Sequence, residues 1–333
     1  MGIISEVKMK KKVLIITTGG TISMRYDDKV GIIPDNNLAE LLGNFPQLTS
    51  AAEIEVLEYS NLPSPHITPH RMFELAKMVD RKISDFDGVV ITHGTDTLEE
   101  TAYMLDLVLT TRIPVIFTAA MRSGSELGLD GPRNIVGAVR VAVHHESIDK
   151  GVLVVMNDEI HTARDVVKAD TGKLESFFSP NYGILGIVDS DQVVYYRKLL
   201  FRENVWTDEL EYNIDLIKAV AGMDGRYIDC SIEKGAKGIV IEAFGRGNLP
   251  LTMLEEIRRA LARNIVVVIT SRVFKGRVLP EYGYEGGGFY LKKMGVILGE
   301  DLKGVKARIK LMALFGKYKE PDLVKKYFAF DYE

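Results

Sequence analysis

The segment Ile91–Thr101, ITHGTDTLEET, places hydroxyl and carboxylate side chains where an apolar run gives way to a helical pattern. Thr97 with Glu100 three positions later matches a helix capping box, so part of the segment is explained by helix capping. Capping leaves Thr95 and Asp96 unexplained. An ionised aspartate is stabilised at a helix N-terminus and could pair with the ammonium group of a ligand. Thr95 could act as a nucleophile if a base removed its proton.

A candidate base follows another apolar strand. The run GVLVVMN, residues 151–157, is typical of a buried strand, and Lys168 lies beyond it in NDEIHTARDVVKADT. A lysine in water is a poor base because its pKa is about 10.4, but burial in a closed site can lower that pKa by several units. Taken by itself, Lys168 is better explained as a surface lysine, the fate of most lysines.

A second hydroxyl candidate follows the first apolar strand, in the segment Thr17–Ser23, TTGGTIS. Its two glycines allow a tight turn, and the exposed N–H groups of such a turn can bind an anion or an oxyanion. Thr21 comes directly after them and is a candidate nucleophile. Alone, the segment also fits an ordinary strand-to-helix turn. The glycine spacings of dinucleotide-binding and phosphate-binding loops are absent, so neither kind of site is predicted.

The histidines do not predict a metal centre. His66 and His70 stand four apart in HITPH, but Pro69 argues against a continuous helix that presents both, and no cysteine or carboxylate completes a site. His93 is interpreted as a hydrogen-bonded structural residue at a strand end. The single cysteine, Cys230, excludes an internal disulfide. We therefore expect no metal site.

The elements that position these residues alternate along the chain. Apolar strands such as 13–17 and 88–92 are separated by amphipathic helices, including segments 37–45 and 69–86. This alternation predicts an α/β fold with a mostly parallel sheet sandwiched by helices. Ligands of such sheets bind beyond the carboxyl ends of the strands, which is where the candidate residues stand. The predicted organisation is a larger N-terminal domain, a connecting segment and a smaller α/β domain, over residues 1–190, 191–211 and 212–333.

Composition and charge exclude several classes of partner. The chain has 333 residues with 42 basic and 46 acidic side chains, a net charge of −4. This balance gives no electrostatic reason to expect a nucleic acid or an anionic membrane as partner. The apolar run after Met9 is too short for a signal peptide, and no stretch reaches the roughly 18 apolar residues of a membrane span. A cytoplasmic protein is expected.

Four segments in one order carry a resemblance to a known family. TTGGTIS, ITHGTDTLEETAYMLDL, AAMRSGSELGLDGPRNI and GVLVVMNDEIHTARDVVKADT together resemble the bacterial-type L-asparaginases, and FGRGNLP extends the likeness into the second domain. The resemblance runs from about Val13 to the last helix. It implies hydrolysis of the side-chain amide of asparagine, and often glutamine, to the acid and ammonia, through hydroxyl nucleophiles and without a cofactor.

The resemblance also implies a role for individual residues. Thr21 matches the primary nucleophile and Tyr26 its partner on the N-terminal loop. Lys168 would activate Thr95. Asp96 would hold the α-ammonium group of the substrate. Ser64 would bind the α-carboxylate, and the backbone N–H groups of Gly20 and Thr95 would stabilise the oxyanion.

The second domain is expected to contribute to the site of a neighbouring subunit. Asn248 matches a family residue of this kind, and Glu285, rather than Glu281, is the favoured acidic partner. These roles would require a homodimer or a homotetramer. Many relatives have glutamine where Pro65 follows Ser64, so selectivity between asparagine and glutamine is left open.

Two alternatives use the same motifs. The first is the amidase subunit of a tRNA-dependent amidotransferase, which carries an extra N-terminal domain, whereas the TTGGTIS strand here begins almost at residue 13. The second is a non-catalytic amino-acid sensor. The presence of both hydroxyl candidates and of Lys168 favours an enzyme over a sensor.

Overall fold

The computed structural model describes residues 10–27, 31–34 and 46–329, which form two compact units. The larger unit holds the residues up to 102 together with 111–179 and 183–202. The smaller unit holds residues 103–110, 180–182 and those from 203 onward. The helix expected over 37–45 lies outside the described residues.

The larger unit is built on a mixed sheet of eight described strands, in the order β12-β11-β8-β7-β6-β5-β1-β4. The strands from β4 to β7 in this order are parallel, and the other three continue the sheet in antiparallel fashion. The mostly parallel sheet predicted from the sequence is thus confirmed, and three antiparallel strands extend it. The bounds are β1 Lys12–Thr17, β4 Glu53–Glu58, β5 Gly88–Thr92, β6 Val115–Thr118, β7 Val152–Met156, β8 Glu159–Thr162, β11 Gly186–Val188 and β12 Val193–Tyr195.

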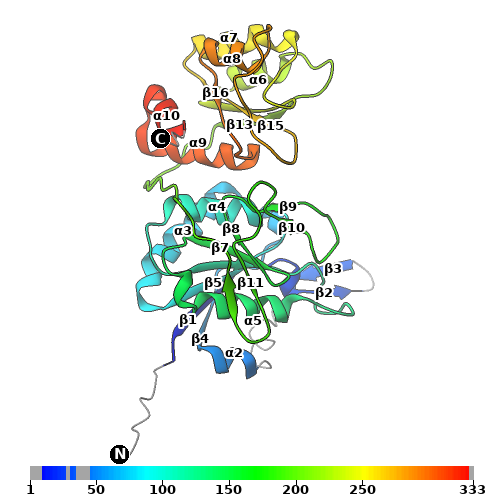
Figure 1. The fold of residues 1–333 in the computed structure, drawn as a ribbon, viewed down its shortest axis with the longest axis vertical. Helices are drawn as coiled ribbons and strands as arrows, with labels where there is room; N and C mark the ends of the chain where they lie inside the picture. The colour runs from blue at the N-terminus through cyan, green and yellow to red at the C-terminus, as the bar shows by residue number, and fades with distance from the viewer. Residues whose placement is uncertain (1–9, 28–30, 35–45, 330–333) are drawn as a thin grey trace, which may run out of the picture. The chain divides into compact units, whose positions relative to one another are not determined.

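Helices cover both faces of this sheet (Figure 1). Helices α2 (Pro46–Ala51) and α5 (Gly131–Ala142) pack on one face, where their apolar residues share a core with β1, β5 and β6. Helices α3 (Pro69–Lys82) and α4 (Leu98–Val108) lie on the other side. Because both faces are covered, the central strands are continuously apolar rather than alternating, and every residue of β5, β6 and β7 is buried.

The helix predicted over 69–86 is divided in two. Helix α3 begins after Thr68, whose hydroxyl accepts from the Arg71 N–H at 3.4 Å, with Pro69 at the first helical position. It ends at Lys82 and passes into the short 3₁₀ turn Ile83–Asp85. The apolar residues Leu98, Ala102 and Leu105 of α4, and Leu109 just beyond it, are at most 1% exposed.

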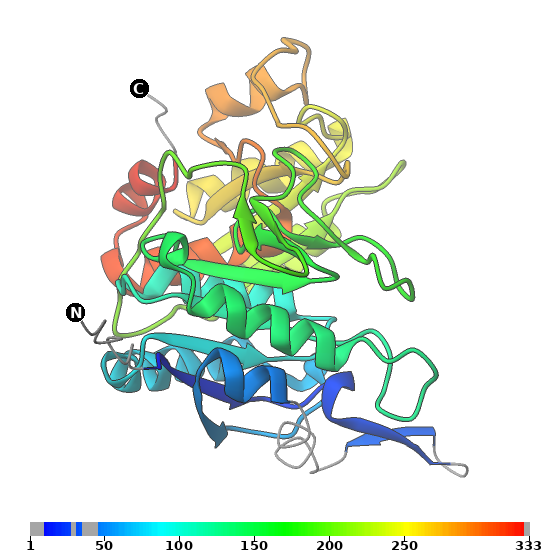
Figure 2. The same cartoon turned by 60° about the horizontal axis from the view of Figure 1, so that its bottom comes forward.

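Two small antiparallel ribbons leave the sheet of the larger unit. Strands β2 (Met24–Asp27) and β3 (Gly31–Pro34) form a ribbon that extends away from the sheet in Figure 2. Strands β9 (Val167–Lys168) and β10 (Phe177–Phe178) form the second, with Lys168 opposite Phe177. Both ribbons carry predicted site residues.

The smaller unit has a parallel sheet in the order β13-β14-β15-β16. Helices α6, α7 and α8 share an apolar core with one face, and α9 lies on the other, with α10 beside it (Figure 1). A smaller α/β domain is therefore confirmed. No described helix is long and apolar enough to cross a bilayer. The bounds are β13 Ile214–Lys218, β14 Gly238–Ala243, β15 Val266–Ser271, β16 Ile297–Leu298, α6 Arg226–Glu233, α7 Leu254–Ala262, α8 Gly288–Met294, α9 Gly304–Tyr318 and α10 Pro321–Phe328.

Candidate active site

The loops that follow β1 and β5 touch through glycine backbone. Gly20 has a positive φ of +86°, and a Cβ atom there would lie 2.3 Å from the Cα atom of Gly94. A Cβ atom on Gly94 would in turn lie 2.6 Å from the Cβ atom of Ser64. Atoms cannot approach so closely, so only glycine fits at both positions. We call this contact between Gly20, Gly94 and Ser64 the glycine junction.

Thr21 leaves the glycine junction on a 3₁₀ turn, Thr21–Ser23. The turn is held by Ile22, which is buried in the core against α5, where a Cβ atom on Gly131 would lie 3.0 Å from the Ile22 side chain. Thr21 itself is half-buried. Tyr26 follows in β2, where its backbone pairs with Ile32.

Lys168 contacts two other predicted residues. Its Nζ atom donates to Thr95 Oγ1 at 2.8 Å and to Asp96 Oδ1 at 2.6 Å. The lysine side chain is only 17% exposed, whereas the Asp96 side chain is 56% exposed. Thr95 is 7% exposed. This cluster joins a buried hydroxyl, an amine and a solvent-facing carboxylate, which are groups capable of proton transfer.

Ser64 anchors the loop that carries Asp96. The Asp96 N–H donates to Ser64 Oγ at 3.2 Å, and the Thr97 hydroxyl donates to the Ser64 carbonyl at 2.8 Å. Ser64 is 4% exposed and opens a short 3₁₀ turn, Ser64–His66. Within the described residues, the proton of the Ser64 hydroxyl meets no acceptor. Pro65, next to it, is exposed.

His93 is a residue of this site for which the sequence predicted only a structural role. It is fully buried, with Nδ1 2.8 Å from the Gly94 carbonyl oxygen and Nε2 3.1 Å from Thr101 Oγ1. Burial lowers the pKa of His93 from 6.5 to about 4, against a smaller opposing effect of the hydrogen bond to Gly94. The ring is therefore neutral at pH 7. The expectation of a hydrogen-bonded histidine is confirmed.

The two predicted residues of the smaller unit follow its strands. Asn248 exchanges two backbone hydrogen bonds of 3.0 Å with Phe244, beyond the end of β14. Among the described residues, the buried Asn248 Oδ1 atom has no hydrogen-bond partner. Glu285 accepts from Arg258 at 3.2 Å, and the other acidic candidate, Glu281, pairs with Arg246 at 3.2 Å.

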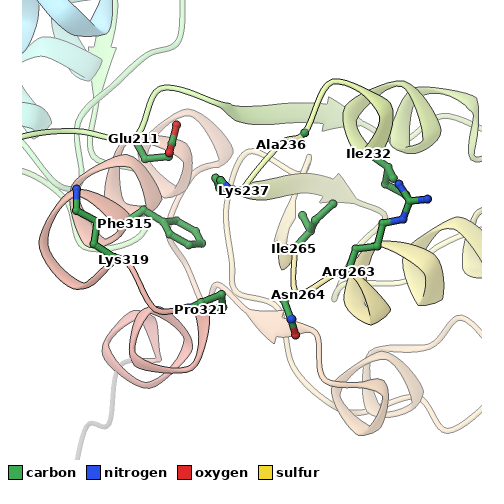
Figure 3. Close-up of a pocket in the computed structure, with 11 residues that line it drawn as sticks. Glu211, Ile232, Ala236, Lys237, Arg263, Asn264, Ile265, Phe315, Lys319 and Pro321 are labelled. Carbon is green, nitrogen blue, oxygen red and sulfur yellow. The ribbon is translucent and has the colours of Figure 1, made fainter.

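The smaller unit also contains a hollow of about 530 Å³. Figure 3 shows Phe315 and Ile265 on opposite sides of it, with Lys237 and Arg263 among its other lining residues. It lies where β14 and β15 begin, at the edge opposite to the carboxyl ends of the strands. None of the predicted site residues lines it, so we place the candidate active site at the glycine junction instead. In the described part of the chain, no group of three or more His, Cys, Asp or Glu side chains could hold a metal ion.

Two family models match the chain. Residues 12–201 match the N-terminal asparaginase model, and residues 213–328 match the glutaminase/asparaginase C-terminal domain. Together these matches span most of the described chain and both compact units.

Relatives of known description are similar over most or nearly all of their length. An L-asparaginase from Bacillus licheniformis is 39% identical, over 94% of this chain and 98% of that protein. A glutamyl-tRNA(Gln) amidotransferase component from Methanococcus maripaludis is 32% identical, over 92% of this chain but 77% of that protein. The solved structure of a probable cytoplasmic L-asparaginase from Campylobacter jejuni superposes with a TM-score of 0.87 at 32% identity, covering 96% of this chain and 99% of the other.

Proposed function

Because this chain belongs to the asparaginase family, we propose that it hydrolyses the side-chain amide of L-asparagine to L-aspartate and ammonia. The observation that carries this proposal is the contact of Lys168 with both Thr95 and Asp96 in a chain whose relatives are named L-asparaginases. Amide hydrolysis needs a nucleophile, donors for the oxyanion and a proton path to the leaving ammonia. The residues around the glycine junction include chemical groups for each of these tasks.

In the proposed reaction, the Thr21 hydroxyl attacks the amide carbon of the substrate. The oxyanion of the tetrahedral intermediate is stabilised by the backbone N–H groups of Gly20 and Thr95. The proton of the Thr21 hydroxyl passes to the amide nitrogen, the C–N bond breaks and ammonia leaves, so that Thr21 is acylated. Water then hydrolyses the ester, which releases L-aspartate and restores the Thr21 hydroxyl. Tyr26 assists Thr21. Lys168 activates Thr95, whose hydroxyl relays protons to and from the reacting groups.

A zwitterionic substrate needs two anchors of different kinds. Asp96 Oδ1 is paired with Lys168, Oδ2 has no partner among the described residues, and the side chain is 56% exposed. We assign this oxygen to the α-ammonium group. The Ser64 hydroxyl, whose oxygen already accepts from Asp96, donates to the α-carboxylate. Pro65 adds no side-chain donor there, so L-glutamine is proposed as a secondary substrate.

The proposal extends to assembly and location. Asn248 and Glu285 are assigned to the site of a neighbouring copy in a homodimer or homotetramer. There the Asn248 Oδ1 atom, which has no partner among the described residues, would accept a hydrogen bond. A cytoplasmic location is proposed on the likeness to the Campylobacter protein, which is described as cytoplasmic. No nucleic acid or membrane partner is proposed.

The experiment is ammonia release by the purified protein, without added metal, from L-asparagine, L-glutamine and D-asparagine in parallel. Faster release from L-asparagine than from L-glutamine supports the proposal, and equal rates would make the enzyme a mixed asparaginase-glutaminase. No release from any of them, with L-asparagine still bound, would support the sensor. Ammonia release that depends on a co-purifying tRNA-binding partner would support the amidotransferase alternative.

A further inference from the structure

His93 and Thr101 have no part in the proposed hydrolysis, although they adjoin its centre. His93 directly precedes the Gly94–Thr95 peptide, and both His93 and Thr101 are fully buried. The His93 ring touches the Gly94 carbonyl at one nitrogen and the Thr101 hydroxyl at the other. The Phe117 ring packs against one side of the His93 ring, with 5.9 Å between the two ring centroids.

The hydrogen bonds determine the tautomer of His93. A carbonyl oxygen only accepts, so the hydrogen must lie on Nδ1 and point at Gly94. The buried ring is neutral at pH 7, so Nε2 is an acceptor. The Thr101 hydroxyl therefore donates to Nε2. The Thr97 carbonyl, 3.0 Å from the same hydroxyl, keeps the Thr101 backbone N–H as its donor at 3.0 Å, so this carbonyl, the ring and the hydroxyl each retain a partner.

The held carbonyl fixes the direction of the next N–H group. The Gly94–Thr95 peptide is trans, so its N–H points opposite to its carbonyl, away from the His93 ring. Within the described residues the Thr95 N–H has no acceptor, whereas the N–H of Asp96, one residue on, donates to Ser64. The free N–H belongs to the residue whose hydroxyl meets Lys168.

We propose that His93 and Thr101 are positioning residues: Thr101 holds the ring, and His93 holds the Gly94 carbonyl so that Thr95 presents its N–H and its hydroxyl to the substrate. This inference rests on the proposed function, in which the Thr95 N–H stabilises the oxyanion. Its effect is expected in kcat rather than KM, because the oxyanion exists only in the transition state and the intermediate.

A kinetic comparison of matched variants tests the inference. Thr101→Val, which removes only the donor to Nε2, should lower kcat for L-asparagine about 10-fold with little change in KM, while Thr101→Ser should keep the wild-type kcat. His93→Leu should lower kcat about 100-fold. His93→Asn, whose amide can donate to the Gly94 carbonyl, should recover most of that loss. A folded Thr101→Val enzyme with unchanged kcat, or equal losses in His93→Asn and His93→Leu, would overturn the positioning role.

A second measurement does not depend on the activity of any variant. Nitrogen NMR of wild-type protein with labelled histidine should show His93 as the Nδ1–H tautomer from neutral pH down to about pH 5, with the signal identified by its loss in His93→Asn. A hydrogen on Nε2 in that range would contradict the inference. Absence of ammonia release by the wild-type protein would overturn the proposed function instead, and the two failures are therefore distinguishable.

Discussion

The Nζ atom of Lys168 lies 2.8 Å from Thr95 Oγ1, although 73 residues separate the two along the chain. The threonine stands in the loop between β5 and α4, and the lysine ends β9, which belongs to a separate two-stranded ribbon. The contact therefore joins the loop after β5 to the ribbon. The pair is therefore produced by the topology, and its chemistry can be tested residue by residue.

Replacing Lys168 by methionine should remove turnover. Without the amine, Thr95 loses its proton acceptor, and kcat should fall by about 10³-fold or more. Lys173→Met is the matched control, because Lys173 lies in the loop between β9 and β10, its side chain is 78% exposed, and its Nζ atom is 3.8 Å from Asp170 Oδ2. Steady-state ammonia release measures both. Activity retained in Lys168→Met would mean that Lys168 does not serve Thr95.

The two threonines should fail differently. Thr21→Ala and Thr95→Ala should each lower kcat by about 10³-fold or more while keeping the wild-type circular dichroism spectrum. Mass spectrometry after rapid acid quenching with L-asparagine separates them, since an acyl-enzyme should accumulate on Thr21 in Thr95→Ala and be absent from Thr21→Ala. Acylation of Thr95 in the wild-type protein would exchange the assigned roles.

The α-ammonium anchor can be isolated with a substrate that lacks the amino group. Asp96→Asn should reduce kcat/KM for L-asparagine by about 10-fold or more, because a charge-assisted hydrogen bond is lost. The same substitution should change kcat/KM for succinamic acid much less. Equal losses with both substrates would show that Asp96 acts through its ion pair with Lys168 rather than on the substrate.

The glycine junction should not tolerate a methyl group. Gly20→Ala places a Cβ atom 2.3 Å from Gly94 at a φ of +86°, so we expect a loss of roughly 1–3 kcal/mol in the free energy of unfolding and a loss of activity. Gly172→Ala is the control, because its Cβ atom would meet nothing within 4 Å and its φ is not positive. Urea unfolding and ammonia release check both. Wild-type behaviour of Gly20→Ala would refute the close contact.

His93 should make stability depend on pH below neutrality. Its pKa is about 4 in the folded protein against 6.5 for the free side chain, so the unfolded chain binds the proton first as the pH falls. Stability is complete above about pH 6.5 and declines towards pH 4, by an amount on the order of 3 kcal/mol. The urea midpoint of His93→Asn should fall less steeply over this range than that of the wild type. Parallel curves would contradict the lowered pKa.

Several parts of the fold are readable from the sequence because burial leaves a pattern. Strands β1 and β5 are continuous apolar runs, and α4 has a regular apolar stripe, so the loops that follow the strands could be predicted. Strands β9, β11 and β12 are two or three residues long. Such short segments have no periodicity of their own, and only their pairing with other strands makes them strands.

Residues of the candidate site could be predicted only where their position in a local motif suggests a role. A threonine and an aspartate at a helix start suggest chemistry. A lysine between ordinary residues is better explained as a surface lysine, and only the family resemblance favours a catalytic role for Lys168. The same limit applies to His93. Its buried contacts with Gly94 and Thr101 depend on how α4 packs, and this packing cannot be predicted from the spacing of residues along the sequence.

The glycine junction also limits which positions of the candidate site can be substituted to change its substrate preference. At Gly20 and Gly94 the walls of the site are main chain, which has no rotamers to exchange and leaves no room for substitution. Variation in substrate preference must therefore arise at exposed neighbours such as Pro65, whose side chain faces solvent. A library aimed at new amide substrates would vary such rim positions and keep the two glycines as an invariant frame.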